Sequence, residues 1–308
     1  MIKVSVTATA MVGALTITAC ASSNGTSPKV DASMEGGPSE PVGCAAGADA
    51  GGHYNPTINP ADFTTKVDNP YFPLVPGTIF HLTDTDNNIV DIEVKSETTR
   101  ISGVETVVVH DTVKFPSGEL SEDTTDWFAQ DKAGNVWYFG EQTTKKSVPG
   151  GPSNPLGSWT YGVDCAKPGI VMEAHPKVGD TYRQEFYAGQ AEDQADVIGL
   201  DEMVTVPYGT FSHCIKTRDY TRFSPGADEN KYYCPGLGNI KTVDLPVSMN
   251  KHEDLVSVTS PVADGGSLDS GSLDSGSRDS GSLEGGLEGG LSDAGSGPQD
   301  AAVDAAHD

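Results

Sequence analysis

Short segments in which apolar and polar residues alternate recur through the middle of this chain, and they constrain its fold more than any other feature. Alternation with a period of two is typical of β-strands, and turn-forming sequences such as residues 131–134 separate the segments. The short spacings favour antiparallel meanders over helical crossovers, and about a dozen strands are expected. The predicted strands include residues 89–97, 105–114, 136–139, 181–187, 211–220, 231–234, 239–244 and 255–259.

The aromatic residues place the folded part of the chain. All 22 lie between Tyr54 and Tyr233, and apolar patterning fades near residue 260, which predicts a β domain at residues 60–260. Residues 20–59 are rich in Ser, Gly, Pro and Ala and are expected to form a flexible tether. Residues 261–308 repeat a Gly-Ser-Leu-Asp-Ser unit and are expected to be an acidic, disordered tail.

The start of the chain predicts export. Lys3 precedes an uncharged run that ends in Ile-Thr-Ala-Cys at Cys20, and this ending resembles a bacterial lipobox. Residues 1–19 are therefore predicted to be a lipoprotein signal peptide, with Cys20 acylated (palmitate) and anchored to the membrane. An ordinary secretory signal with an incidental Cys20 is the alternative. Ala21, in place of aspartate, favours an outer-membrane or surface location in a Gram-negative cell.

Charge argues against one class of partner. The chain has 44 acidic and 19 basic side chains, so its formal net charge is -25. Binding to nucleic acid normally depends on clustered Lys and Arg that neutralise phosphates, so nucleic acid is not an expected partner. Because the electrostatic field of so acidic a chain repels anions, an anionic small molecule would bind only at a site with a local excess of basic groups.

A hairpin with aromatic side chains on both faces is predicted around residues 131–134. A type I turn followed by a left-handed glycine would close residues 127–129 onto residues 137–139. A strand pair that is aromatic on both faces is either buried on both sides or lines a cavity. The candidate ligand-binding residues are Trp127, Trp137 and Phe139 on one face, and Phe128 and Tyr138 on the other.

Two stretches of the chain, about a hundred residues apart, look alike. Residues 75–78 and 178–181 each precede a predicted strand, and residues 102–106 resemble residues 207–211. An internal duplication would give either two similar β units or one pseudo-symmetric open barrel. Shared turn chemistry is the alternative explanation.

Five longer runs of the chain carry a recognisable pattern: NPYFPLVPGT (69–78), DWFAQDKAGNVWYFGE (126–141), KPGIVMEAHPKVGDTYRQE (167–185), VPYGTFSHC (206–214) and KYYCPGLGNIK (231–241). They resemble the runs of a family of secreted bacterial proteins and lipoproteins of undefined activity. The pattern VPxGTF followed by YYxPGxG also resembles envelope lipoproteins with half-barrel β folds, distantly similar to lipid-carrier domains. The resemblance implies a mainly β, open or half barrel in the cell envelope, but no catalytic residues. Cys234 departs from it, because a small residue such as alanine is expected there.

Apart from Cys20, four cysteines are available for disulfides in an oxidising compartment, and they allow three pairings. Cys214 and Cys234 flank a predicted hairpin and could face each other across its strands, which favours a bridge between them. Cys44 and Cys165 would then pair by default, or Cys44 would keep a free thiol.

Catalytic candidates are few. His110, Glu141, Glu173 and His175 have the chemistry of acids and bases, and they could meet in a barrel mouth. The sequence contains no HExxH motif, no closely spaced cysteine pair and no glycine-rich phosphate loop, so neither a metal nor another cofactor is expected.

Two functions remain open. The favoured hypothesis is a non-catalytic envelope lipoprotein that binds an apolar or amphipathic ligand in a β cavity. The alternative is an extracytoplasmic hydrolase or isomerase. Convergence of two or more of the four candidates in a pocket would favour the enzyme, and an aromatic cavity without titratable pairs would favour the binder. The sequence leaves the ligand and the oligomeric state open.

Overall fold

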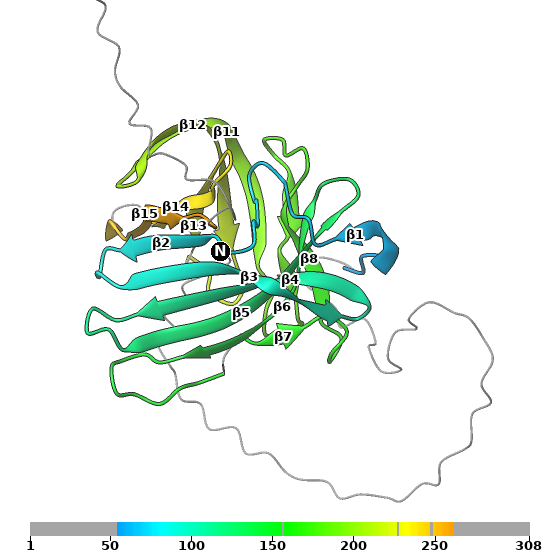
Figure 1. Ribbon diagram of the computed structural model, residues 1–308, viewed down its shortest axis with the longest axis horizontal. Coiled ribbons are helices and arrows are strands. Elements are labelled where there is room, and N and C mark those ends of the chain that lie inside the picture. Colours follow the sequence, from blue (N-terminus) through cyan, green and yellow to red (C-terminus); the bar gives the residue numbers. More distant parts are fainter. Residues whose placement is uncertain (1–53, 156, 227, 247–248, 262–308) are drawn as a thin grey trace, which may run out of the picture. The chain divides into compact units, whose positions relative to one another are not determined.

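The computed structural model describes residues 54–261, apart from residues 156, 227 and 247–248 (Figure 1). The predicted signal peptide, Cys20, Cys44 and the predicted acidic tail lie outside the described residues. Within the described ranges, no helix has the length and apolar character needed to cross a membrane.

The mainly β prediction is confirmed. Within the described part of the chain, fifteen strands form one antiparallel sheet that remains open, in the order β10-β8-β6-β5-β4-β3-β2-β15-β14-β13-β12-β11-β9, with β1 on β5 and β7 on β6. After a short 3-10 helix at Pro60–Asp62, the strands are β1 Phe63–Thr64, β2 Ile79–Asp84, β3 Ile89–Ile101, β4 Val104–Lys114, β5 Leu120–Asp131, β6 Val136–Lys145, β7 Trp159–Thr160, β8 Lys167–Met172, β9 Thr181–Arg183, β10 Glu185–Phe186, β11 Gln194–Val206, β12 Gly209–Tyr220, β13 Glu229–Cys234, β14 Gly238–Asp244 and β15 His252–Thr259.

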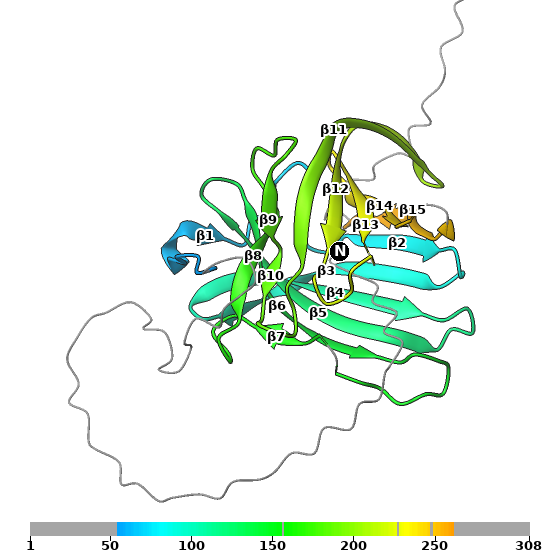
Figure 2. The ribbon, with the colours of Figure 1, turned by 180° about the vertical axis from the view of Figure 1, so that it is seen from behind.

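The strand predicted at residues 181–187 is divided in two. β9 pairs with β11 and β10 pairs with β8, which are near the two opposite ends of the sheet order. Gln184 lies between them and its backbone N–H donates to the carbonyl of Asp193 at 2.8 Å. Figure 2 shows β8, β9, β10 and β11 side by side, so this short segment links the two ends of the open sheet.

The sheet can be divided into two meanders. One runs from β2 to β6 and continues to β8 and β10, and the other consists of β9 and β11 to β15; the 13-residue strands β3 and β11 each begin a long hairpin, β3–β4 and β11–β12. The strand starts also match: Gly77 N donates to Val94 O at 2.7 Å, and Gly179 N donates to Val197 O at 2.9 Å. The sequence similarity between residues 75–78 and 178–181 therefore corresponds to equivalent positions in the two meanders.

The aromatic hairpin has the predicted faces, and its register is as expected at Phe128 and Ala129, but a register shift places Trp127 opposite Gly140 in place of Phe139. Phe128 pairs with Tyr138 across β5 and β6, and their rings stack with centroids 4.8 Å apart. Both belong to the large core inside the curved sheet, whereas Phe139 belongs to a smaller core on the other face, against which Trp127 and Trp137 pack. The strand pair is therefore buried on both sides.

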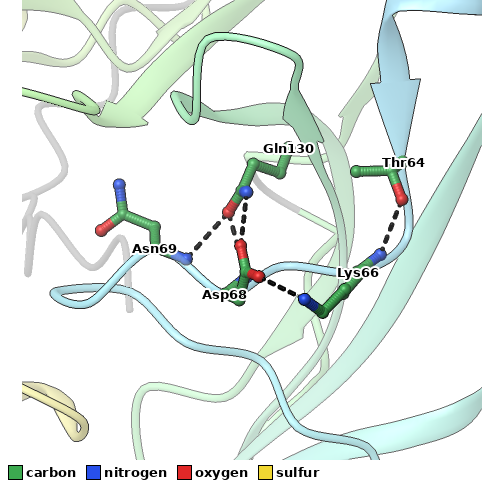
Figure 3. Close-up of polar contacts among 5 residues, drawn as sticks. All are labelled: Thr64, Lys66, Asp68, Asn69 and Gln130. Atoms are coloured by element: carbon green, nitrogen blue, oxygen red, sulfur yellow. Dashed lines mark hydrogen bonds and ion pairs between the residues drawn. The ribbon is translucent and has the colours of Figure 1, made fainter.

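A strap, defined here as residues 65–78 between β1 and β2, is fastened to β5 (Figure 3). Gln130 Oε1 accepts hydrogen bonds from the backbone N–H groups of Asp68 and Asn69, at 3.0 and 2.8 Å. Gln130 Nε2 donates to Asp68 Oδ1 at 2.8 Å, and Lys66 Nζ donates to Asp68 Oδ2 at 2.6 Å. Lys66 N also donates to Thr64 Oγ1 at 3.1 Å, which fixes the start of the strap.

The strap fills part of the interior beside the aromatic hairpin. The ring of Phe72 lies 5.4 Å from that of Phe128 and 6.3 Å from that of Tyr233, measured between centroids. The carbonyl of Pro70 accepts a hydrogen bond from Gly236 N at 2.7 Å, in the turn between β13 and β14. Three of the runs that carry the family resemblance thus meet here to build the core.

Cys214 and Cys234 form a disulfide, as the sequence predicted, and their Cα atoms are 4.2 Å apart. β12 and β13 pair with Ile215 opposite Tyr233 and Thr217 opposite Lys231, which is the register that places the two cysteines opposite each other. Cys165 is also disulfide-bonded.

Candidate functional site

A pocket of about 240 Å³ opens where β7 joins β6. Its wall includes the aromatic side chains of Trp127, Trp159 and Tyr187 and the carboxyl groups of Glu141 and Asp164. Aromatic faces combined with a few polar groups are the usual lining of a small-molecule site. This pocket is therefore the candidate functional site.

One glycine lets β7 lie close enough to form this wall. Gly140 pairs with Thr160, and its φ of +138° is in the region that favours glycine. A Cβ atom at this position would lie 2.4 Å from the carbonyl oxygen of Trp159. The close approach of the two backbones brings Glu141 opposite Trp159 in the register.

Glu141 is the polar residue of the pocket with the most perturbed environment. Burial raises the pKa of its carboxyl well above the ordinary value, and the neighbouring Asp126 carboxyl raises it further. No hydrogen bond joins the Glu141 side chain to another residue of the described chain. The carboxyl is thus partly buried, close to another acid and available to a ligand.

Asp126 lies opposite Glu141 on β5, facing the interior. Burial raises the pKa of its carboxyl to about 7; the hydrogen bond from Tyr138 opposes this shift, and the Asp111 carboxyl adds to it. The Tyr138 hydroxyl donates to Asp126 Oδ1 at 2.5 Å. Burial and the Asp126 carboxylate in turn raise the pKa of Tyr138, so this hydroxyl keeps its proton and donates a hydrogen bond to Asp126 at neutral pH.

Glu185 and Asp193 complete a group that we call the carboxyl cluster: Asp126, Glu141, Glu185 and Asp193. Trp159 Nε1 donates to Glu185 Oε2 at 2.6 Å, which fixes the indole ring in the pocket wall. Burial raises the pKa of Glu185 well above its ordinary value, and the Asp193 and Glu141 carboxyls raise it further. Burial also raises the pKa of Asp193 to about 6, against the lowering effect of Lys231. The cluster can hold protons at neutral pH and favours a positive charge nearby.

Lys231 is at the centre of a second buried polar group. Its Nζ atom lies 3.1 Å from Asp219 Oδ2 and 2.9 Å from Glu229 Oε1, and all three side chains are almost fully buried. Burial raises the pKa of Glu229 to about 7, although Lys231 lowers it. A buried ion pair of this kind costs desolvation energy and is strongly destabilised when one partner is removed, so we assign it a structural role.

The four catalytic candidates do not converge. His110 Nε2 lies 2.8 Å from Asp123 Oδ1 on the outer face of the sheet, away from the buried Asp111. His175 is exposed. Glu173 has a pKa raised to about 7 by burial and by the Asp180 carboxyl, but no hydrogen bond or ion pair of the described chain joins it to His175. Glu141 is the member of the four that lines the pocket.

Of the five aromatic candidates, Trp127 lines the pocket. Phe128 and Tyr138 pack in the large core, which the strap fills on one side. The ring of Phe139 lies 5.3 Å from that of Phe63, and Trp137 Nε1 donates to Asp131 Oδ2 at 2.8 Å. These four side chains thus have partners within the chain itself.

Sequence reasoning missed Asp126, Trp159, Glu185 and Asp193. Asp126 could have been found, because it alternates with Phe128 and therefore shares the inward face of β5. Trp159 and Glu185 lie in the two-residue strands β7 and β10, and Asp193 lies just before β11. Segments this short show no alternation of apolar and polar residues, so the sequence does not indicate that they reach the pocket. Among the described residues, no group of three or more His, Cys, Asp or Glu side chains is placed to hold a metal ion.

The sequence matches no protein-family model and no curated protein. Among solved structures, a protein from Bacteroides fragilis, provisionally named an exported protein with a YmcC-like fold, is similar with a TM-score of 0.37 and 14% identity. A protein from Parabacteroides distasonis, provisionally named a lipoprotein, is similar with a TM-score of 0.34 and 14% identity. Each comparison covers 61% of this chain and 98% of the other chain. The proposals below rest on the residues of this chain.

Proposed function

We propose that this protein is an exported lipoprotein of the cell envelope that binds a small amphipathic ligand, without transforming it, in the pocket beside β7. The observation that carries the proposal is the pocket itself, in which Trp127 and Trp159 offer apolar faces beside the unpaired carboxyl of Glu141. Its volume of about 240 Å³ lies below the roughly 300–1,000 Å³ of pockets for drug-sized molecules, which favours a small ligand.

The arrangement of titratable groups supports binding over catalysis. An acid–base mechanism needs a positioned donor and acceptor around the reacting atoms. His110, His175 and Glu173 lie apart from the pocket, and Glu141 is the one catalytic candidate in its wall. The lipobox ending at Cys20 and the predicted tether support a position at the envelope surface.

An enzyme is the second candidate, and one observation favours it. A carboxyl with a raised pKa in a pocket is what a general acid requires, and Glu141 meets that condition. A hydrolase built on Glu141 would release a product, whereas a binding protein would return its ligand unchanged. The mass of the bound molecule before and after incubation with the protein separates the two.

Protein purified from its native host is expected to carry a small molecule that native mass spectrometry detects. Trp127→Leu should reduce its occupancy about tenfold or more, because a buried indole contributes more than 1.4 kcal/mol of contact. Trp137→Leu is the matched control, since Trp137 belongs to the same hairpin and packs against the same smaller core as Trp127 but is not among the residues that line the pocket. Equal occupancy in both variants would remove the pocket as the binding site.

Cys20→Ser is expected to abolish labelling by a radioactive fatty acid and to release the protein from the membrane fraction, because a single lipidated cysteine is the predicted anchor. Cys44→Ser should remain labelled and membrane-bound, which controls for loss of a cysteine in the same segment. Continued membrane fractionation of the Cys20→Ser variant would contradict the lipoprotein assignment.

A further inference from the structure

We propose that the ligand of this pocket carries a cationic amine, whose ammonium group contacts Glu141 and displaces a proton from the carboxyl cluster into solvent. This inference rests on the proposed function, because it assigns a chemical class of ligand to the same pocket. It goes beyond that function by selecting a cation over neutral and anionic amphiphiles of the same shape. Three features support it: the charges around Glu141, the aromatic lining of the pocket and the protonation of the carboxyl cluster.

The charged groups that face Glu141 are mostly acids. Lys145 of β6 is the base among them, and its Nζ lies 3.4 Å from Glu122 Oε2, so much of its charge is already balanced. A bound anion would meet this excess of acids in a site that water screens poorly, whereas a cation would be attracted. The titratable groups that act on Glu141 are Asp126 and Glu122 of β5, Tyr138 and Lys145 of β6, Glu185 of β10, and Asp193 before β11. Asp164 and Tyr187 line the same pocket and add one more acid and one hydroxyl.

The aromatic part of the wall suits the same class of ligand. Ammonium groups are attracted to the faces of Trp and Tyr rings, most strongly where water is excluded. Trp127, Trp159 and Tyr187 line the pocket together with Glu141, and the hydrogen bond from Trp159 to Glu185 holds one of these rings in place. A carboxyl beside aromatic faces provides both a counter-charge for the amine and a contact surface for its apolar chain.

Protonation gives the proposal a second measurable consequence. Burial raises the pKa of Asp126 to about 7 and that of Glu141 well above its ordinary value, so when the pocket is empty these carboxyls hold protons that exposed carboxyls would have lost. An adjacent cation favours the ionised form of a carboxyl, so an ammonium group should cause a net release of protons as it binds. A neutral ligand of the same length should release none. Glu141 has no hydrogen-bond partner to lose in the described chain, so it can accept a charge-assisted hydrogen bond from the amine.

The test compares hexylammonium, 1-hexanol and hexanoate, which share a six-carbon chain and differ in charge. Isothermal titration calorimetry with the whole protein, in two buffers of different ionisation enthalpy, gives the affinity and the number of protons released. At pH 7 we expect hexylammonium to bind about tenfold more tightly than 1-hexanol or better, with a net release of protons. Hexanoate should bind more weakly than both. Hexylammonium should bind more weakly at pH 6, because the carboxyls then hold their protons more firmly.

Two variants locate the effect. Glu141→Gln keeps the shape of the side chain and should abolish both the preference for hexylammonium and the proton release, while 1-hexanol still binds. Glu97→Gln makes the same charge change at an exposed position of β3 and should retain both. Equal affinity of hexylammonium and 1-hexanol, lost in Trp127→Leu, would overturn the cationic assignment and leave the binding function intact. A folded protein that binds none of the three probes would overturn both.

Discussion

Replacing Gly169 with alanine is expected to lower the free energy of unfolding by about 3 kcal/mol or more, because the new methyl group would collide with backbone. A Cβ atom at Gly169 would lie 2.3 Å from the carbonyl carbon of Gln184 and 2.5 Å from the carbonyl oxygen of Arg183. These atoms belong to the segment that joins β9 to β10, so they cannot move without loosening the link between the two ends of the sheet. Urea unfolding followed by far-UV circular dichroism measures the loss.

Gly199→Ala is the matched control for that substitution. Gly199 also lies in a strand, β11, but its added Cβ atom would meet only the flexible carboxyl end of Glu202. We expect the free energy of unfolding of this variant to remain within about 0.5 kcal/mol of that of the parent protein, because the Glu202 side chain can rotate away from the added methyl group. A similar small change at Gly169 would show that the link between β9 and β10 tolerates displacement.

The protein is expected to be more stable at pH 5 than at pH 8, which is the second large effect. Asp126, with a folded pKa of about 7, and Asp193, with about 6, hold protons in the folded state that their unfolded forms release near pH 4. Between about pH 4 and pH 7 the folded protein therefore binds more protons, so the free energy of unfolding falls as pH rises. Asp126 alone accounts for about 3 kcal/mol between pH 5 and pH 8.

Surface ion pairs do not reverse this direction. The exposed Asp62 has a lowered pKa, chiefly through its hydrogen bond from Lys132. Its contribution to folding stability is therefore lost only as the pH falls through this lowered pKa, which lies below the range from pH 5 to pH 8. Urea midpoints measured at pH 5 and pH 8 test the expectation. Asp126→Asn should flatten the dependence, because the amide can still accept the hydrogen bond from Tyr138 but cannot ionise.

Asp123→Asn removes the same charge from β5 on the outer face, beside His110, and controls for the general repulsion within an acidic chain. We expect this variant to keep most of the pH dependence of the parent. If Asp126→Asn and Asp123→Asn flatten the pH dependence of stability equally, the effect is due to net charge, and the role assigned to the buried carboxyls is wrong. A parent protein that is more stable at pH 8 than at pH 5 would contradict the sign.

Local chemistry explains what the sequence could predict. The turn at residues 131–134 forms because Asp131 Oδ1 accepts hydrogen bonds from the backbone of Ala133 and Asn135, each at 2.9 Å. Alternation then assigns Phe128 and Tyr138 to one face, as found. The same reasoning gave the register that joins Cys214 to Cys234. Each of these results depends on residues close together in the chain or on one hairpin.

Pairing between distant residues explains what was missed. The division of the predicted strand at Gln184 follows from partners on β8 and β11, and nothing within residues 181–187 indicates that two strands compete for it. The sequence identified residues 69–78 of the strap as a motif but did not predict their position, because the side chain that anchors the strap, Gln130, is about sixty residues away in the chain. Glu141 was named as a candidate, but its neighbours Glu185 and Asp193 reach it only through the tertiary fold.

The pairing of β2 with β15 affects how the chain acquires its structure. Ile79 lies opposite Thr259, so the first long strand remains without this neighbour until the last strand of the domain is in place. Contacts of such long sequence separation are slow to form, because loop-closure entropy opposes them. Meanwhile both strands present unpaired edges that can capture other copies of the chain. Glu253 and Asp254 on β15 place charge at this vulnerable edge, and protection against aggregation is complete only when the last strand docks.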